Sequence, residues 1–199
     1  MTISEYFNPI KSYELFGYKE KFIFFKDLFT NNQFPRVLLL TGDRGIGKFT
    51  LVNHLLHYYF DKEYESKKNK INPKSSFHQE FINGLFPNIF YLKSISSKSL
   101  KLDDVRKLKD DLSKSSIYNK KRFIILDDVE TYNTNILNAL LKIIEEPSIN
   151  NNFILINNKS SSLLETIKSR SIEIKILQNN LIIKQILSPL LNLYSSRLL

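Results

Sequence analysis

Residues 37–50 read VLLLTGDRGIGKFT, and this stretch decides the fold. An apolar run ends at a glycine-rich loop, and the loop ends at Lys48, where a helical pattern begins. This is the layout of a phosphate-binding P-loop, G-x-x-x-x-G-K-[ST], in which backbone N–H groups cradle phosphate oxygens at a helix N-terminus. Gly42, Gly45, Gly47 and Lys48 fit this layout, but Phe49 stands where the motif has the hydroxyl that binds Mg²⁺.

The composition bounds the class of protein. At 199 residues the chain suits one domain plus a small appendage. The net charge of +9 fits nucleic-acid or nucleotide partners and equally fits a Lys-rich composition drifting with an AT-rich genome, because the lysines are scattered. The chain has no cysteine, which excludes disulfides and thiolate metal sites. Without a signal-peptide core or a run of roughly 18 apolar residues, we expect a soluble, cytoplasmic protein and no membrane partner.

Short apolar runs alternate with amphipathic segments along the chain. We expect strands at 37–41, 89–92, 123–126, 153–156 and 172–176, and helices at 17–29, 49–60, 102–112, 134–146 and 161–168. Residues 61–87 lack sustained periodicity and are interpreted as an exposed insertion, and residues 181–199 as one or two helices. Strands that alternate with helices predict an α/β fold with a five-stranded parallel sheet flanked by helices.

Two adjacent acids follow the third apolar run, in residues 123–128 (FIILDD). Asp127, at the end of a buried strand beside a P-loop, matches the Walker B acid that holds the metal and its water shell. Asp128 occupies the position of the Glu that polarises water in many such ATPases. It is shorter by one methylene, about 1.5 Å of reach, so capping of the following helix is the favoured interpretation for Asp128.

Arg170 lies within Ser169-Arg170-Ser171, just ahead of the fifth predicted strand. It could pair with an acid of its own domain. It could instead project across a subunit interface as an arginine finger toward the γ-phosphate of a neighbour. The tripeptide alone leaves both interpretations open.

Together these segments resemble the bacterial clamp-loader branch of the AAA+ ATPases, and most of all its delta-prime subunits in the DNA polymerase III holoenzyme. The matching segments are LFGYKEK (15–21), QFPRVLLLTGDRGIGKFTL (33–51), IILDD (124–128), NILNALLKIIEEPS (135–148) and FILINNKSSSLLETIKSRSIEI (153–174). Their order and spacing follow the family over roughly residues 13–177. The resemblance implies an AAA+ P-loop domain over residues 1–177, a partial helical lid over 178–199, and no collar domain.

The resemblance also implies a function and partners. Delta-prime subunits often lack ATPase activity and sit at one end of a five-subunit arc that opens the sliding clamp and places it on primed DNA. We therefore expect a non-catalytic subunit that contacts gamma/tau and delta subunits, and that meets the clamp and primer-template DNA through the complex. The resemblance assigns the arginine finger, supplied to the nucleotide of an adjacent subunit, to Arg170.

We expect no significant ATPase activity, because Phe49 removes a metal ligand and Asp128 is short. Thr50 lies one residue too late to replace the hydroxyl, about 100° around the helix. Weak ATP or ADP binding is left open, with no cofactor required. The candidate nucleotide-binding residues are Gly42, Gly45, Gly47, Lys48, Thr50, Asp127, Asp128 and Asn158, the last by its resemblance to the sensor 1 polar residue.

No metal is expected either. The family usually holds a structural zinc with four cysteines in the insertion after the first helix of the P-loop, and residues 61–87 contain none. His78 alone cannot replace such a site, and His54, His57 and His78 are interpreted as surface or helix residues.

Two other functions are kept. One is an active motor-type, gamma/tau-like clamp-loader ATPase or another DNA-dependent P-loop ATPase. The other is a nucleic-acid-binding module driven by the net charge of +9, whose binding would weaken steeply with salt.

Overall fold

The computed structural model describes residues 8–94, 100–114, 120–145, 148–158, 165–177 and 188. The chain forms two compact units. The helical unit comprises Met1–Phe34, Ile46–Ile82 and Leu177–Leu199, and the sheet unit comprises Pro35–Gly45 and Asn83–Ile176.

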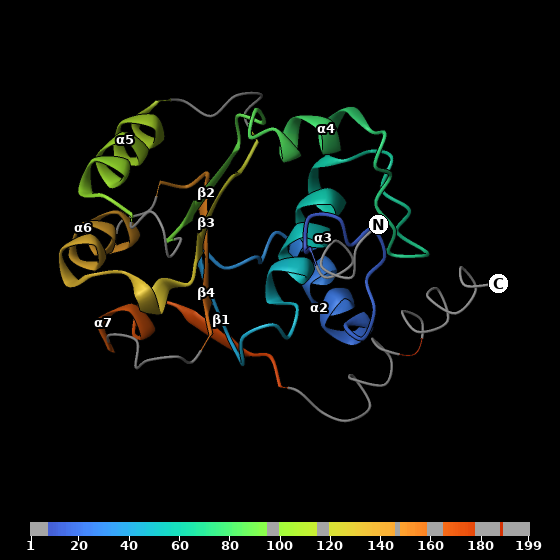
Figure 1. The fold of residues 1–199 in the computed structure, drawn as a ribbon, viewed down its shortest axis with the longest axis horizontal. Coiled ribbons are helices and arrows are strands. Elements are labelled where there is room, and N and C mark those ends of the chain that lie inside the picture. Colours follow the sequence, from blue (N-terminus) through green and yellow to red (C-terminus); the bar gives the residue numbers. More distant parts are fainter. Residues whose placement is uncertain are drawn as a thin grey trace. The chain divides into compact units, whose positions relative to one another are not determined.

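The sheet unit is built on five strands in the order β2-β3-β4-β1-β5, all paired in parallel (Figure 1). The strands are β1 (Val37–Thr41), β2 (Ile89–Lys93), β3 (Arg122–Asp127), β4 (Asn151–Asn157) and β5 (Ile172–Lys175). β1, β3 and β4 are buried along their whole length, as their uninterrupted apolar runs predict. The α/β class and the five-stranded parallel sheet are therefore confirmed. Because every strand runs the same way, all carboxyl ends meet at one end of the sheet.

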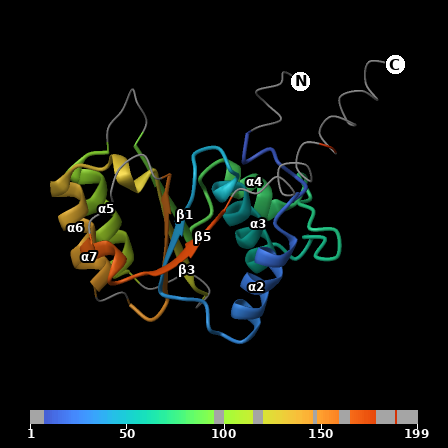
Figure 2. The same ribbon diagram turned by 90° about the horizontal axis from the view of Figure 1, so that it is seen from below.

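Three helices of this unit lie together on one side of the sheet in both ribbon views (Figure 1; Figure 2). They are α5 (Leu102–Ser113), α6 (Thr134–Glu145) and α7 (Glu165–Lys168). The apolar side chains that they bury against the sheet include Val105, Leu108, Ile136, Leu140 and Ile167, which join Leu39, Ile124, Leu126 and Leu155 in one core. Burial of each such side chain contributes about 1.5–3 kcal/mol to stability. The spacing of the apolar residues along each helix therefore determines which face of the helix packs against the sheet.

Arg122, at the start of β3, is only 5% exposed and ties the end of α5 to the sheet. Its guanidinium donates to the carbonyl oxygens of Asp111, Leu112 and Lys114 at 2.8–3.1 Å and to Asn151 Oδ1 at 2.9 Å. The last carbonyls of a helix have no partner within the helix. Arg122 supplies donors to them, and burial lowers the pKa of its guanidinium.

The helical unit contains α2 (Lys19–Thr30), α3 (Lys48–Phe60) and α4 (Ser76–Ile82). The predicted amphipathic face of α2 is confirmed at Phe22 and Phe25, which are fully buried. The Phe22 ring meets the rings of His54 and Tyr58 of α3 edge-on, at centroid distances of 6.4 and 6.1 Å. Aromatic packing therefore joins α2 to α3.

The interpretation of residues 61–87 as an exposed insertion is wrong. Tyr64, Ile71 and Phe77 are buried, and α4 lies within this segment. With only 7 residues, α4 is too short to show a helical period in the sequence.

All three histidines lie on helices, one of the two alternatives expected for them, but none lies at the surface. His54 and His57 of α3 are fully buried, and His78 of α4 is 2% exposed. The His57 ring packs edge-on against Phe77 and Phe81, at 4.9 and 5.5 Å between centroids, and hydrogen-bonds His78 at 2.9 Å. A histidine ring can be buried in this way because its ring nitrogens, the polar atoms of the side chain, have hydrogen-bond partners.

The fifth strand is more exposed than its alternation predicts: Ile172 is 59% exposed, while Ile176, just beyond the strand, is buried. Residues 159–164, within the predicted fourth-to-fifth strand connection, lie outside the described residues, as do 178–187 and 189–199, where a lid was expected. Within the part of the chain that the structure describes, no helix is long and apolar enough to cross a membrane.

Candidate functional site

The glycine-rich loop follows β1, and its shape depends on two glycines. A Cβ atom on Gly42 would overlap the carbonyl oxygen of Ile176 in the sheet unit. Gly47, in the helical unit, adopts φ +91° at the N-cap of α3, a left-handed conformation that side chains rarely adopt. The Tyr18 hydroxyl donates to the Ile46 carbonyl just before Gly47, and burial raises the pKa of Tyr18 to about 12, so the donor keeps its proton at neutral pH.

Lys48 is the first residue of α3 and is 3% exposed. Phe49 and Thr50 follow in the same turn and are half-buried. A helix N-terminus of this kind favours anions, because its first N–H groups point outward and the helix dipole is positive there. The phosphate-binding role of Lys48 and the loop stays a prediction.

Asp127 and Asp128 lie at the carboxyl end of β3, and each is 5% exposed. Asp128 has φ +56° and ψ +42°, a left-handed conformation that is uncommon for residues other than glycine. It precedes the short 3-10 helix η2 (Val129–Thr131), but its side chain makes no capping hydrogen bond. Asp128 thus occupies the N-cap position, as the capping interpretation expects, but its carboxylate makes no capping hydrogen bond and is bonded elsewhere.

Lys93 joins the two acids. It is the register partner of Asp127 across the β2–β3 pair. Its Nζ lies 2.9 Å from Asp127 Oδ2 and 3.3 Å from Asp128 Oδ2, and the Tyr91 hydroxyl donates to Asp127 Oδ2 at 2.8 Å. Burial opposes the charged form of Lys93, but the hydrogen bond and charge of Asp127, with those of Asp128, outweigh it and raise the pKa of Lys93.

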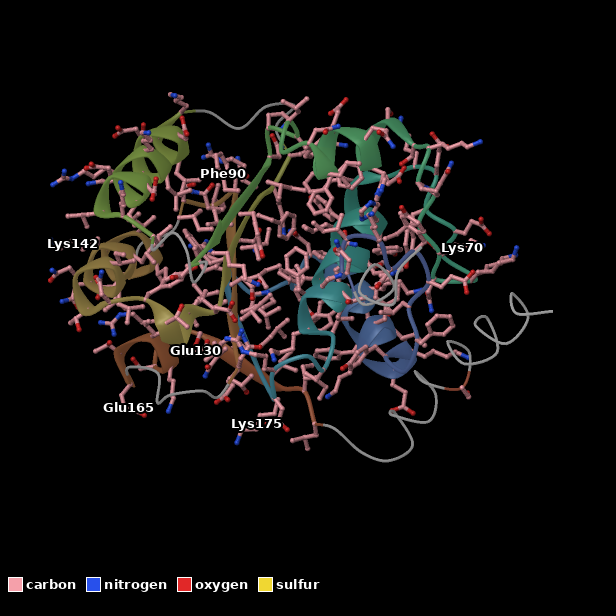
Figure 3. The ribbon with its side chains drawn as sticks, viewed as in Figure 1. Lys70, Phe90, Glu130, Lys142, Glu165 and Lys175 are labelled. Atoms are coloured by element: carbon pink, nitrogen blue, oxygen red, sulfur yellow. The ribbon has the colours of Figure 1, made fainter. Side chains whose placement is uncertain are left out.

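Arg44, Asn158 and Glu130 complete the network around Asp128. Arg44 Nη2 lies 3.1 Å from Asp128 Oδ1 and 3.7 Å from Glu130 Oε1. The Asn158 side-chain amide donates to the same Asp128 Oδ1, and its backbone N–H donates to Glu130 Oε2 at 3.2 Å. Figure 3 shows Glu130 at the end of the sheet where the strands finish, with Lys175. The carboxylates of Asp127, Asp128 and Glu130 are thus paired with two cationic side chains of the same chain, Lys93 and Arg44.

The structure therefore brings three predicted residues, Asp127, Asp128 and Asn158, into one bonded group. Sequence reasoning missed Lys93 and Glu130. Lys93 ends the strand that lies beside β3, so its position near the two acids could have been predicted if the strand order had been known. Whether this group binds a nucleotide stays a prediction.

This group does not fit Mg²⁺, the metal that a P-loop implies. Mg²⁺ needs oxygen ligands at about 2.1 Å in octahedral geometry. Here Asp127 Oδ2 accepts from both Lys93 and Tyr91, and Asp128 meets Lys93, Arg44 and Asn158. No group of three or more His, Cys, Asp or Glu among the described residues is arranged to hold a metal ion.

Arg170, the predicted arginine finger, follows α7 and is paired within its own unit. Its Nη2 lies 3.0 Å from Glu145 Oε1, and its Nη1 donates to the Thr166 carbonyl at 3.0 Å. Both charged side chains stay accessible, with 39% of Arg170 and 44% of Glu145 exposed. The structure thus shows the pairing within the domain, and the finger role is untested.

A family model and curated relatives match most of this chain. The family described as "DNA polymerase III, delta subunit" matches residues 17–180. The DNA polymerase III subunit delta' of Pseudomonas aeruginosa is 31% identical over 142 residues, 71% of this chain and 43% of that protein. The Bacillus subtilis subunit delta' is 27% identical over 137 residues, 66% of this chain and 39% of that protein.

A solved structure supports the fold. A DNA polymerase III gamma subunit-related protein from Thermotoga maritima aligns with a TM-score of 0.57 at 19% identity, covering 80% of this chain and 46% of that chain. This chain spans less than half the length of the two delta' relatives that it matches.

Proposed function

The chain belongs to the family described as DNA polymerase III, delta subunit, and we propose that it is a non-catalytic, delta'-type subunit of a clamp loader. In this role it helps to load a sliding clamp onto primed DNA and does not hydrolyse ATP itself. Its partners are the gamma/tau and delta subunits, and it meets the clamp and the DNA through the complex.

The observation that carries the non-catalytic proposal is the pairing of the Asp127 and Asp128 carboxylates with Lys93 and Arg44. Metal-assisted phosphoryl transfer needs these oxygens to hold Mg²⁺ and to orient the attacking water. Side chains already bonded to an ammonium and a guanidinium do neither. Phe49 supports the same conclusion, since it removes the hydroxyl ligand from the P-loop motif.

We propose further that Arg170 acts on the nucleotide of an adjacent subunit. Its contact with Glu145 joins two exposed side chains, and such ion pairs are worth only about 0–1 kcal/mol. A phosphate carries more charge than one carboxylate and accepts two parallel hydrogen bonds from a guanidinium. A γ-phosphate brought near by assembly would therefore compete well with Glu145 for Arg170.

The test reconstitutes a clamp loader from this chain with gamma/tau and delta subunits and measures DNA-dependent ATP turnover. Arg170→Ala is expected to lower turnover severalfold while the complex still assembles on a sizing column. Arg106→Ala is the matched control, because Arg106 is also exposed and also pairs with an acid of its own unit, Asp103, at 2.8 Å. It should leave turnover unchanged.

Two results would overturn parts of this proposal. Unchanged turnover in an assembled Arg170→Ala complex removes the finger role. Robust ATP hydrolysis by the isolated chain removes the non-catalytic role and favours a motor-type subunit.

A further inference from the structure

We propose that Lys93 is a built-in cation that takes the place of a divalent metal ion on Asp127 and Asp128. The inference concerns the charge at the end of the sheet unit, so it stands whether or not the chain works in a clamp loader. It predicts that this group of acids excludes Mg²⁺ and Mn²⁺ as long as Lys93 is present.

The first argument is the need for positive charge. The side chains of Asp127 and Asp128 are each 7% exposed, and that of Glu130 is fully buried. Buried carboxylates must be paired with a cation or coordinate a metal. In this chain the ammonium of Lys93 meets one oxygen of each aspartate, the bridging position that a divalent ion would take between two acids.

The second argument is that the backbone fixes Lys93 in this position. β2 pairs with β3 in parallel, and the register sets Lys93 opposite Asp127. The Lys93 ammonium therefore reaches the acids from a strand of the same sheet. Arg44 differs, because it comes from the glycine-rich loop, has a side chain 63% exposed, and forms its ion pairs with Asp128 and Glu130. Lys93 thus has an ion pair with each of the two aspartates.

The consequence is a hidden metal site. If the ammonium is removed and the stem is kept, two buried carboxylates remain side by side with no bridging charge. Carboxylate oxygens are the ligands that Mg²⁺ and Mn²⁺ prefer. Lys93→Met keeps an unbranched apolar side chain of similar length and deletes only the charge. We expect this variant to bind a divalent ion that the natural chain excludes.

The experiment measures Mn²⁺ binding by the electron paramagnetic resonance signal of unbound Mn²⁺, together with the shift in Tm. In Lys93→Met, Mn²⁺ is expected to bind at one site per chain at least about tenfold more tightly than in the natural chain, and to raise the Tm. Adding Asp127→Asn to this variant should remove both effects. Lys93→Arg keeps the charge and should bind no more Mn²⁺ than the natural chain.

Lys175→Met is the matched control, because Lys175 is an exposed lysine at the end of β5 in the same unit. It should behave like the natural chain. The inference is overturned if folded Lys93→Met gains no Mn²⁺ binding. A second test does not depend on the folding of Lys93→Met. If the natural chain binds Mn²⁺ and its Asp127→Asn variant does not, then Lys93 does not exclude the metal, and the inference is overturned.

Discussion

Arg170 donates from one terminal nitrogen to Glu145, at 3.0 Å, and from the other to the carbonyl oxygen of Thr166, also at 3.0 Å. Both terminal nitrogens of the Arg170 guanidinium, Nη1 and Nη2, therefore already have partners within the chain. A phosphate brought near Arg170 would compete with Glu145 for the guanidinium. Glu145 belongs to the segment NILNALLKIIEEPS, so the motif at the end of α6 holds the arginine that follows α7.

We predict that Glu145→Gln makes Arg170 easier to engage. Since an exposed ion pair is worth about 1 kcal/mol at most, the concentration of this subunit that half-saturates ATP turnover in a reconstituted clamp loader should fall by up to about fivefold. The turnover at saturation should not change. The measurement is a titration of the subunit into gamma/tau and delta.

Glu165→Gln is the control for that titration. Glu165 is an exposed acid of α7 that pairs with Lys168 at 2.8 Å and lies on the outer side of the helix layer (Figure 3). If Glu145→Gln behaves like Glu165→Gln while Arg170→Ala still lowers turnover, the Glu145 contact does not restrain the arginine.

Restoring the P-loop hydroxyl should not restore hydrolysis. Phe49→Thr supplies the missing ligand of the motif, but Lys93 still bonds to Asp127 and Asp128. We expect ATP turnover of the isolated variant to stay at background in a steady-state assay with Mg²⁺. Turnover comparable to a clamp-loader motor in Phe49→Thr alone would show that the acids release Lys93 when a nucleotide binds.

The helical unit should lose stability in mild acid. Burial lowers the pKa of His54 to about 3 and that of His57 to about 4, below the value near 6.5 in an unfolded chain. The unfolded chain therefore binds these protons first as the pH falls. The stabilisation is complete above about pH 6.5 and is lost as the pH falls toward 4, by an amount on the order of 3 kcal/mol for each histidine.

Urea unfolding at several pH values measures this loss. His57→Gln keeps a polar side chain but cannot be protonated in this range, so its unfolding free energy should depend less on pH than that of the natural chain. An equal pH dependence in both proteins would show that His57 does not contribute to the loss. His54 should be compared separately, because its partners differ: it hydrogen-bonds Tyr64 and the Ser12 carbonyl, both at 3.0 Å.

Arg122→Ala should destabilise the sheet unit by about 3 kcal/mol, since it leaves buried acceptors at the end of α5 without a donor. Arg122→Lys should recover only part of this, because an ammonium cannot match the planar fork of the guanidinium. Chemical denaturation gives both values, and Arg106→Ala, on the exposed face of α5, should change stability by less than about 0.5 kcal/mol. An equal effect of the two alanine variants would contradict the structural role of Arg122.

The sequence predicts those parts of the structure that depend on neighbours along the chain. The buried runs of β1, β3 and β4 and the apolar spacing of α5 are local signals, and each element forms where expected. The missed features depend on contacts between distant segments. Lys93 and Asp127 are 34 residues apart and meet only because β2 lies beside β3. The burial of His57 likewise requires Phe77 and Phe81 to fold back over it.

The backbone conformation of Asp128 is a further feature that bears on the proposed lack of ATP hydrolysis. Aspartate is one of the few residues that tolerate a left-handed conformation, because its short polar side chain can bond locally. Replacement by the longer glutamate of active ATPases would strain the turn by about 1 kcal/mol. It would also move the carboxylate away from Arg44 and Asn158. Under the proposed non-catalytic role, ATPase activity would require coordinated changes of turn geometry, side-chain length and counter-charge, and no single substitution provides all three.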